Sequence, residues 1–177
     1  MKLLIVVDVQ HDFVDGVLGT LDAQAIVPNV AEKVKSYEHW GYPILYTRDT
    51  HFADKYMDTQ EGKLLPVPHC IHGTDGWKII PEVYTPNYSY LLDKPSFGYL
   101  EIVGAIERIQ SNRNELIDAI EIIGLCTDIC VVSNALILKA AFPETFISCD
   151  SSCCAGTCNA AHEAALKTMT SCQIHVY

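Results

Sequence analysis

Residues 121–135, EIIGLCTDICVVSNA, join the end of an apolar strand to the start of a helix. The apolar run turns at Gly124, and an apolar pattern with helical spacing follows Thr127 and Asp128. Cys130 lies close to the expected helix start, where free backbone N–H groups and the positive end of the helix dipole favour a thiolate. In an open α/β sheet, ligands bind where strands lead into helices. The stretch therefore predicts a nucleophilic cysteine at one edge of a sheet.

Strand-like and helix-like stretches alternate on both sides of this segment. Strands are expected at residues 2–9, 44–47, 88–92, 116–124, 145–149 and 173–176, and helices at residues 25–40, 100–109, 129–141 and 159–169. Residues 49–86 have no regular pattern for most of their length, and a loop this long usually carries function. The alternation is typical of a parallel sheet covered on both faces. We therefore expect an α/β fold: a single three-layer αβα domain, residues 1–177, with a mainly parallel six-stranded sheet.

The charge balance limits the partners of the chain. It has 22 acidic and 12 basic side chains among 177 residues, which gives a formal net charge of −10. Binding to nucleic acid requires clustered Lys and Arg, so neither nucleic acid nor an anionic membrane surface is an expected partner. The apolar run after Met1 is too short for a signal peptide or a membrane span. A cytoplasmic location is therefore expected.

The chain contains eight cysteines, which in a cytoplasmic protein indicate reduced thiols rather than a disulfide framework. They are Cys70, Cys126, Cys130, Cys149, Cys153, Cys154, Cys158 and Cys172. Four of them crowd the C-terminal third, where they could form a second metal site. We favour the interpretation that they are small buried residues.

Polar or reactive side chains follow four of the expected strands. They are Asp8, the pair Asp49 and His51, Lys94, and Cys130. Taken singly, each has an ordinary interpretation as a turn, capping or surface residue. The carboxyl ends of parallel strands lie at the same edge of a sheet, so these side chains are expected to meet there. Their joint occurrence predicts an active site.

Several short motifs resemble those of the isochorismatase-like cysteine hydrolases, a family that includes the nicotinamidases. They are DVQHDF at residues 8–13, KPSF at residues 94–97, GLCTDICV at residues 124–131, and CD at residues 149–150 with AAHEAAL at residues 160–166. The matches occur in the family's order, and the resemblance covers nearly the whole chain. It implies an isochorismatase-like, Rossmann-like fold and a cysteine amidohydrolase that acts on non-peptide C–N bonds.

By this resemblance, Asp8, Lys94 and Cys130 form a catalytic triad. Amide cleavage requires a nucleophile, a proton carrier for the leaving amine and donors for the oxyanion. Cys130 would attack the carbonyl, Asp8 would carry the proton, and the charge of Lys94 would favour the thiolate. The resemblance also implies an oxyanion hole made of the backbone N–H groups of Cys126 and Cys130, with a cis peptide bond between Leu125 and Cys126.

A second group of side chains lies in the long loop. Asp49, His51 and His69, with Glu61 between them, are residue types that bind divalent metals. In metal-dependent nicotinamidases, an Asp and two His residues bind the metal with a fourth ligand from the intervening loop. Asp49, His51 and His69 match this set directly, and Glu61 is the expected fourth ligand, with His72 as its competitor. Zinc is the expected metal, with iron or manganese as alternatives.

The metal ligands point to a substrate. A metal beside the triad would bind the ring nitrogen of nicotinamide and hold its carboxamide against Cys130. Phe13 and Leu125 are expected to line the substrate pocket. The resemblance therefore implies a metal-dependent nicotinamidase that converts nicotinamide and water to nicotinate and ammonia through a thioester intermediate. Homo-oligomers are common in the family, so one is expected here.

Other functions are also compatible with the sequence. The family often has a large aromatic residue ahead of the second metal-binding His, whereas residues 65–68 read LPVP, with Trp77 or Tyr99 as substitutes. Another small-amide or ureido hydrolase with the same triad is one alternative. In a second, zinc activates water by itself. In a third, the fold is a non-catalytic binding module with a redox-sensitive thiol at Cys130.

Overall fold

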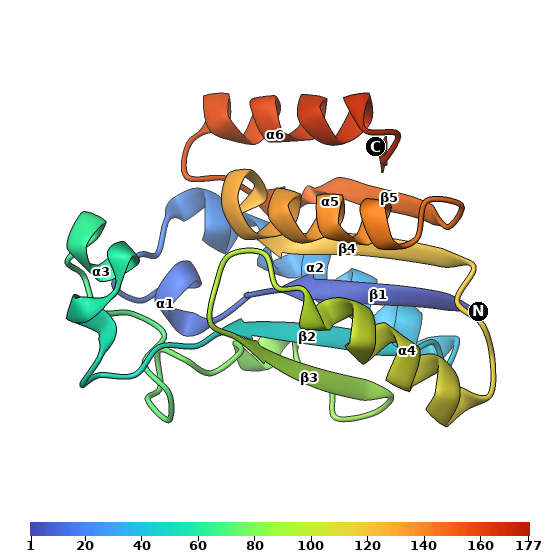
Figure 1. Cartoon of the computed structure of the whole chain (residues 1–177), viewed down its shortest axis with the longest axis horizontal. Coiled ribbons are helices and arrows are strands. Elements are labelled where there is room, and N and C mark those ends of the chain that lie inside the picture. The colour runs from blue at the N-terminus through green and yellow to red at the C-terminus, as the bar shows by residue number, and fades with distance from the viewer.

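The computed structural model describes all of residues 1–177 and contains one six-stranded sheet (Figure 1). The strand order is β3-β2-β1-β4-β5-β6, and all neighbouring strands are parallel. The strands are β1 (Lys2–Val7), β2 (Ile44–Asp49), β3 (Ser89–Lys94), β4 (Ala119–Leu125), β5 (Phe146–Ala155) and β6 (His175–Val176). The expected fold class is confirmed.

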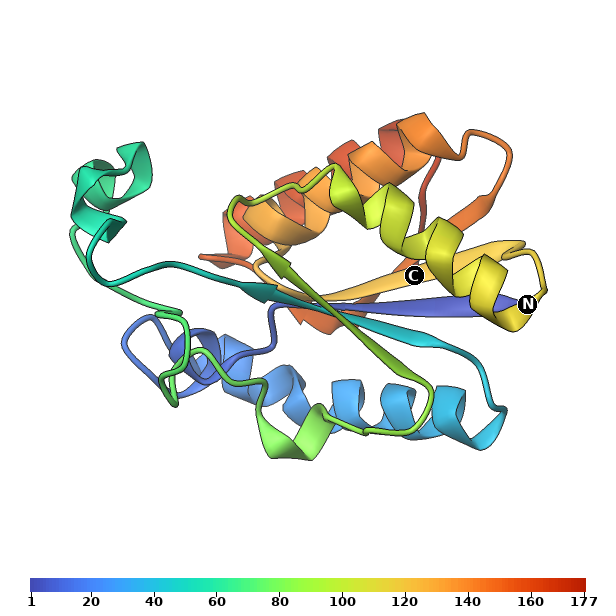
Figure 2. The same cartoon turned by 60° about the horizontal axis from the view of Figure 1, so that its bottom comes forward.

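Helices cover both faces of the sheet (Figure 2). On one face lies α2 (Leu21–His39). On the other face lie α4 (Glu101–Arg113), α5 (Val132–Ala141) and α6 (Asn159–Ser171). This gives the three layers expected from the alternation of strands and helices. None of the helices combines the length and the apolar character that crossing a membrane would require.

Short helices lie beyond the carboxyl ends of the strands, at the left of Figure 1. They are α1 (His11–Val14) and α3 (Gln60–Leu64), with a 3₁₀ turn at Tyr56–Asp58. The sequence pattern does not reveal them because a single helical turn is too short to establish a periodicity. The 49–86 loop therefore has more regular structure than expected. A second 3₁₀ turn, Pro81–Val83, lies beside α2 instead, where the carbonyl oxygen of Val83 accepts a hydrogen bond from Tyr46 of β2 at 2.8 Å.

Two element boundaries differ from expectation for local reasons. α2 begins earlier, at Leu21, because the side chain of Thr20 accepts a hydrogen bond from the backbone N–H of Ala23 at 3.0 Å and caps the helix. β5 continues past Cys149 to Ala155 because its second half pairs with the end of β4 after a register shift. The extension places part of the cysteine-rich segment in the sheet.

The core is centred on β1, which lies between β2 and β4. Residues 3–7 of this strand are at most 1% exposed. Residues 3–7 read LLIVV, and such a continuous apolar run is typical of a strand that is buried on both faces. The strand therefore provides a rigid base for the residue that follows it, Asp8.

Gly124 marks a close approach between β4 and β1. It has φ +122°, next to a register shift in β4, and a Cβ atom at this position would overlap the carbonyl oxygen of Val7. We expect Gly124→Ala to lower the free energy of unfolding by about 3 kcal/mol, because it adds both a steric overlap and a disfavoured backbone conformation. Urea denaturation of the purified proteins measures this difference.

Gly73→Ala is the matched control for this prediction. Gly73 also has a positive φ, +83°, but a Cβ atom there would meet no other atom within 4 Å. Its replacement should therefore lower the free energy of unfolding by only about 1 kcal/mol, from the backbone conformation alone. Equal losses in the two variants would contradict the importance of the contact with Val7.

Candidate active site

Asp8, Lys94 and Cys130 meet at the carboxyl edge of the sheet, although they are far apart in the sequence. Lys94 Nζ lies 2.7 Å from Asp8 Oδ2 and 3.4 Å from Cys130 Sγ. Asp8 and Lys94 are fully buried, and Cys130 is 4% exposed. Lys94 Nζ also donates to the carbonyl oxygen of Ser96 at 3.1 Å, and Thr47 Oγ1 donates to Asp8 Oδ1 at 2.7 Å. The acid, amine and thiol expected from the strand ends are thus in contact.

Each of these side chains is positioned by the end of a strand. Asp8 follows β1 directly and has a left-handed backbone, φ +49°, which Asp tolerates better than most residues. Lys94 is the last residue of β3. Cys130 lies in a π-helical turn, Thr127–Val131, between β4 and α5. A regular helix was expected from residue 129; the wider turn replaces its first residues, and such turns are frequent at functional sites.

Burial opposes ionisation of the Cys130 thiol. Loss of water raises the pKa of Cys130 well above its usual value, the charge of Asp8 raises it further, and Lys94 opposes both. The thiolate that the helix start and Lys94 favour therefore forms against the effect of burial. Burial also raises the pKa of Asp8, against the effect of Lys94, which makes this carboxylate a stronger base.

Lys94 stays cationic in this setting. Burial alone would lower its pKa, but the carboxylate of Asp8 raises it above the usual value for a lysine. A permanent positive charge therefore lies between the acid and the sulfur. It can compensate the negative charge that forms when the thiol loses its proton.

The turn that carries Cys130 is held from both ends. The peptide bond between Leu125 and Cys126 is cis, as the resemblance implies. Asn134 Nδ2 donates to the carbonyl oxygens of Cys130, at 2.8 Å, and of Phe97, at 2.9 Å. This buried amide joins the turn to the loop after Lys94. The sequence offered one signal for this role, since position 134 lies one helical turn after the cysteine.

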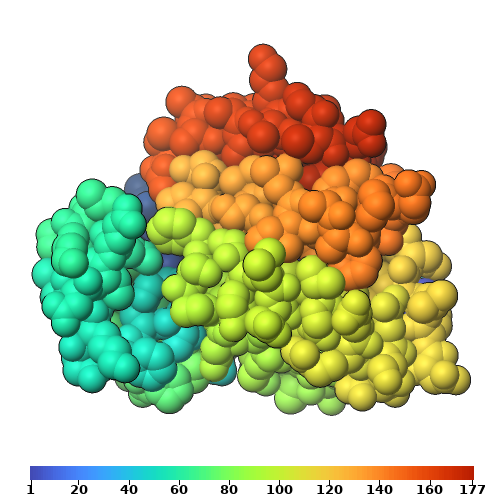
Figure 3. All heavy atoms as spheres, viewed as in Figure 1, coloured from blue at the N-terminus to red at the C-terminus, as the bar shows by residue number.

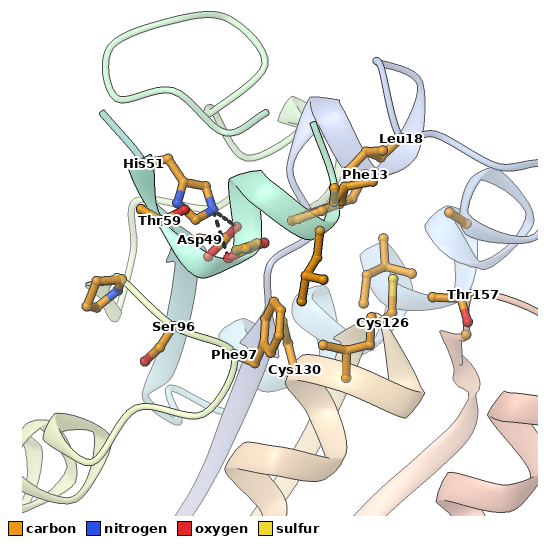
Figure 4. Close-up of a pocket in the computed structure, with 18 of the residues that line it drawn as sticks. Phe13, Leu18, Asp49, His51, Thr59, Ser96, Phe97, Cys126, Cys130 and Thr157 are labelled. Atoms are coloured by element: carbon orange, nitrogen blue, oxygen red, sulfur yellow. Dashed lines mark hydrogen bonds and ion pairs between the residues drawn. The ribbon is translucent and has the colours of Figure 1, made fainter. Parts of the chain in front are cut away.

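Asp49, His51, Glu61 and His69 converge beside these three residues, and Figure 4 shows Asp49 and His51 at the end of β2. His51 Nε2 and His69 Nε2 lie 2.9 Å and 3.5 Å from Asp49 Oδ2. The Glu61 carboxylate lies 3.5 Å from His69 Nε2 and 3.7 Å from His51 Nε2. Ligand atoms of all four lie within 4.8 Å of one another. Asp49 Oδ1 is 3.6 Å from Lys94 Nζ, so the two groups adjoin.

The chemistry of this cluster suits a divalent transition metal. Two imidazoles and two carboxylates are a donor set that zinc, iron and manganese accept. Asp49 Oδ1 is buried without a hydrogen-bond partner. Burial would lower the pKa of His69, but hydrogen bonds with Asp49 and Glu61 raise it to about 10. The carboxylates therefore favour a positive charge between them.

Glu61, rather than its competitor His72, reaches the cluster. Glu61 lies in the first turn of α3, whose N-cap Thr59 accepts a hydrogen bond from the backbone N–H of Gly62 at 2.9 Å. His72 instead packs against the rings of Phe52 and Trp77, with centroid distances of 5.7 Å and 4.6 Å. The short capped helix, which the sequence pattern did not predict, is what directs the fourth side chain inward.

One cavity of about 720 Å³ connects the thiol with the cluster. Figure 3 shows a hollow between the segment that contains α3 and the segment after β3. The lining includes both expected pocket residues, Phe13 and Leu125, as well as Cys126 and Cys130 (Figure 4). No lysine or arginine lines the cavity, and half of its 20 lining residues are hydrophobic. The cavity therefore suits a neutral ligand with an apolar part.

The aromatic residue in the cavity differs from the expected substitutes. Neither Trp77 nor Tyr99 lines it, whereas Phe97 does (Figure 4). The guanidinium of Arg48 lies over the ring of Trp77, 3.8 Å from its centroid. Phe97 follows Lys94 closely in the sequence and comes from the loop after β3, whereas Phe13 comes from α1.

Gln10 and Asp12 are site residues that the sequence reasoning missed. The side-chain amide of Gln10 is hydrogen-bonded to the backbone of Asp49, and a carboxylate oxygen of Asp12 accepts from the backbone N–H of Cys70. Both belong to the DVQHDF motif, in which only Asp8 and Phe13 were assigned roles. Their place in that motif was the sequence feature that could have indicated a role at the site.

The C-terminal cysteines do not form a second metal site. All eight cysteines are free thiols, and Cys149, Cys153 and Cys154 are buried. The sulfurs of Cys149 and Cys154 lie 3.7 Å apart. The structure contains a single group of three or more side chains arranged to hold a metal, the one at Asp49. The interpretation as small buried residues is confirmed for Cys149, Cys153 and Cys154 but is wrong for Cys158, which is exposed.

Comparison with known proteins places these features in context. A family model described as the isochorismatase domain matches residues 2–177. A curated relative, the nicotinamidase/pyrazinamidase of Mycobacterium tuberculosis, is 29% identical over 150 residues, which covers 76% of this chain and 77% of the relative.

Solved structures share the fold over almost the whole chain. The nicotinamidase/pyrazinamidase of Bacillus subtilis has a TM-score of 0.83 and 24% identity, covering 99% of this chain and 98% of that one. The pyrazinamidase of Pyrococcus horikoshii, solved in complex with zinc, has a TM-score of 0.81 and 23% identity, with coverages of 99% and 98%. The N-carbamoylsarcosine amidase of Thermoplasma acidophilum has a TM-score of 0.81 and 23% identity, with coverages of 99% and 94%.

Proposed function

This chain belongs to the isochorismatase domain family, and on that premise we propose that it is a metal-dependent amidohydrolase with Cys130 as nucleophile and nicotinamide as a substrate. The observation that carries the proposal is the contact of Lys94 Nζ with both Asp8 and Cys130. The cavity that Cys130 lines also reaches the candidate metal ligands Asp49, His51 and Glu61. The names of the curated relative and of the solved structures support the choice of a nicotinamide-type amide.

The first half of the reaction forms a thioester. Asp8 takes the proton of the Cys130 thiol, and the sulfur attacks the carbonyl carbon of the amide. The backbone N–H groups of Cys126 and Cys130 are the proposed donors to the oxyanion. Asp8 then returns the proton to the departing nitrogen, so that ammonia leaves and the acyl group remains on sulfur. Lys94 holds Asp8 in place and compensates the charge on the sulfur.

The second half releases the acid. Asp8, again ionised, takes a proton from a water molecule that attacks the thioester carbonyl. The carbon–sulfur bond breaks and Cys130 regains a proton from Asp8. The sum is amide plus water to carboxylic acid plus ammonia. The raised pKa of Asp8 suits both steps, since a carboxylate that is easily protonated exchanges a proton with a buried thiol more readily.

Asp49, His51, Glu61 and His69 are the residues that would hold a divalent metal, and we propose zinc. When bound, such a metal acts as a Lewis acid that orients a ligand with a free lone pair. The buried side chains of Asp49, His51 and His69, with the partly exposed Glu61, would hold it next to Lys94. The complex of the Pyrococcus horikoshii relative with zinc supports the choice of metal.

The proposal is tested by turnover of a panel of amides. Purified protein should release ammonia from nicotinamide, and elemental analysis should find about one metal ion per chain. Isochorismate and other anionic compounds should not react, because no cationic side chain lines the cavity. Release of ammonia from N-carbamoyl amino acids but not from nicotinamide would favour a ureido hydrolase with the same nucleophile. The similarity to the N-carbamoylsarcosine amidase is the reason to test this alternative.

A further inference from the structure

Residues 8–12 contact both segments that supply candidate metal ligands, the end of β2 with Asp49 and the turn with His69. We propose that Gln10 and Asp12 are positioning residues for the metal. Gln10 holds the strand end that carries Asp49, and Asp12 holds the turn that carries His69. The proposal rests on the proposed function in one respect, namely that the cluster binds a divalent metal.

Gln10 fixes the backbone of Asp49 on both sides. Its Nε2 donates to the carbonyl oxygen of Asp49 at 2.9 Å and to that of Trp77 at 2.8 Å. Its Oε1 accepts from the backbone N–H of Asp49 at 2.7 Å. The side chain is fully buried and does not line the cavity. All hydrogen bonds of this side chain thus go to backbone groups, and its role at the site is to hold Asp49 in position.

Asp12 fixes the turn after His69. Its Oδ2 accepts from the backbone N–H of Cys70 at 2.7 Å. Cys70 has φ +46°, a left-handed conformation that is unusual for a residue other than glycine and that a charged hydrogen bond can stabilise. Asp12 is itself held, since its backbone N–H donates to the carbonyl oxygen of Gly76 at 3.0 Å. Asp12 therefore holds the backbone directly after His69, while the His69 ring itself is hydrogen-bonded through Nδ1 to Val67 and Tyr56.

The end of β2 and the turn that follows His69 are joined to each other, and both contact the segment that begins with Asp8. The backbone N–H of His51 donates to the carbonyl oxygen of Cys70 at 3.0 Å, so the end of β2 and the His69 turn lie side by side. Asp8 begins the same segment that contains Gln10 and Asp12. One stretch of five residues thus sets the positions of the acid beside Cys130 and of ligands on both sides of the cluster. Metal affinity is sensitive to such supports, because small displacements spoil the coordination geometry.

The test measures metal affinity directly, by competition between the full-length protein and a chromogenic zinc chelator. Gln10→Met keeps the size of the side chain but removes its hydrogen bonds, and Asp12→Ala removes the carboxylate. Each should weaken zinc binding by about 10- to 100-fold. Asp12→Asn keeps an oxygen that can accept from Cys70 and should restore affinity close to that of the parent. Asp15→Ala is the matched control, because Asp15 is exposed and its side chain bonds only to His11.

A purely structural role predicts a different result. In that case the variants would melt at lower temperature without metal, yet bind zinc as tightly as the parent, and the proposal would be overturned. If Gln10→Met does not fold, the Asp12 pair decides alone, because Asp12 is only partly buried. A parent protein without measurable affinity for zinc, iron or manganese would refute the metal part of the proposed function as well, whereas tight binding by parent and variants alike refutes only this inference.

Discussion

Cys130→Ala should reduce ammonia release from nicotinamide by at least about 1,000-fold, because removing a covalent nucleophile leaves only the binding contribution to catalysis. The side chain is small and lies in a buried turn, so the loss of one sulfur should leave the fold and the metal cluster in place. The measurement is the initial rate of ammonia release, with circular dichroism and metal content determined on the same samples.

Cys172→Ala is the control for this variant. Cys172 is an exposed thiol at the end of α6, outside the cavity, and its loss should leave the rate unchanged. Substantial turnover by Cys130→Ala that disappears on chelation would instead support the alternative in which zinc activates water without a covalent intermediate. The pair of variants therefore separates the two chemistries.

Removal of the metal should lower turnover by about 100-fold or more, because the substrate would lose the group that orients it against the thiol. Dialysis against a strong chelator, followed by dialysis against metal-free buffer, gives the apo protein. Added zinc should restore the rate, and His69→Ala should behave like the apo protein in either condition. Ammonia release and elemental analysis on each sample provide the readout.

A second measurement makes this result specific to the substrate. The apo protein should still react at Cys130 with a small alkylating reagent, since Lys94, which is outside the metal-binding set, contacts both the sulfur and Asp8. An apo protein with full activity on nicotinamide would contradict the role of the cluster in substrate binding, while the nucleophilic account of Cys130 would stand.

Much of the fold could be predicted from the sequence because its signals are local. The buried strands read as apolar runs, and the polar residues after them, Asp8 and Lys94, do meet at one edge. The position of Glu61 could not be predicted with the same certainty, because it depends on α3, a helix of five residues with no periodic pattern. The effect of burial on the pKa of Cys130 could not be predicted either, because burial is a tertiary property.

The hydrogen-bond partners of Gln10 and Asn134 could not be predicted from the sequence for a related reason. Each amide hydrogen-bonds to backbone groups that are distant in the chain, at Asp49 and Phe97 respectively. Every residue has a backbone carbonyl group, so a side chain that hydrogen-bonds to one does not require any particular residue type in its partner. The sequence therefore contains no matching pair of residue types from which the contact could be predicted. Such contacts become visible only once the topology brings the segments together.

The central place of β1 has a consequence for biosynthesis. This strand is translated before the rest of the sheet, and one of its two neighbours, β4, follows only after more than a hundred further residues. Until then, one side of a very apolar strand has no partner, and long-range parallel pairing of this kind forms slowly. An intermediate that lacks β4 also lacks the turn with Cys130, so the reactive sulfur cannot meet Asp8 until β1 and β4 have paired.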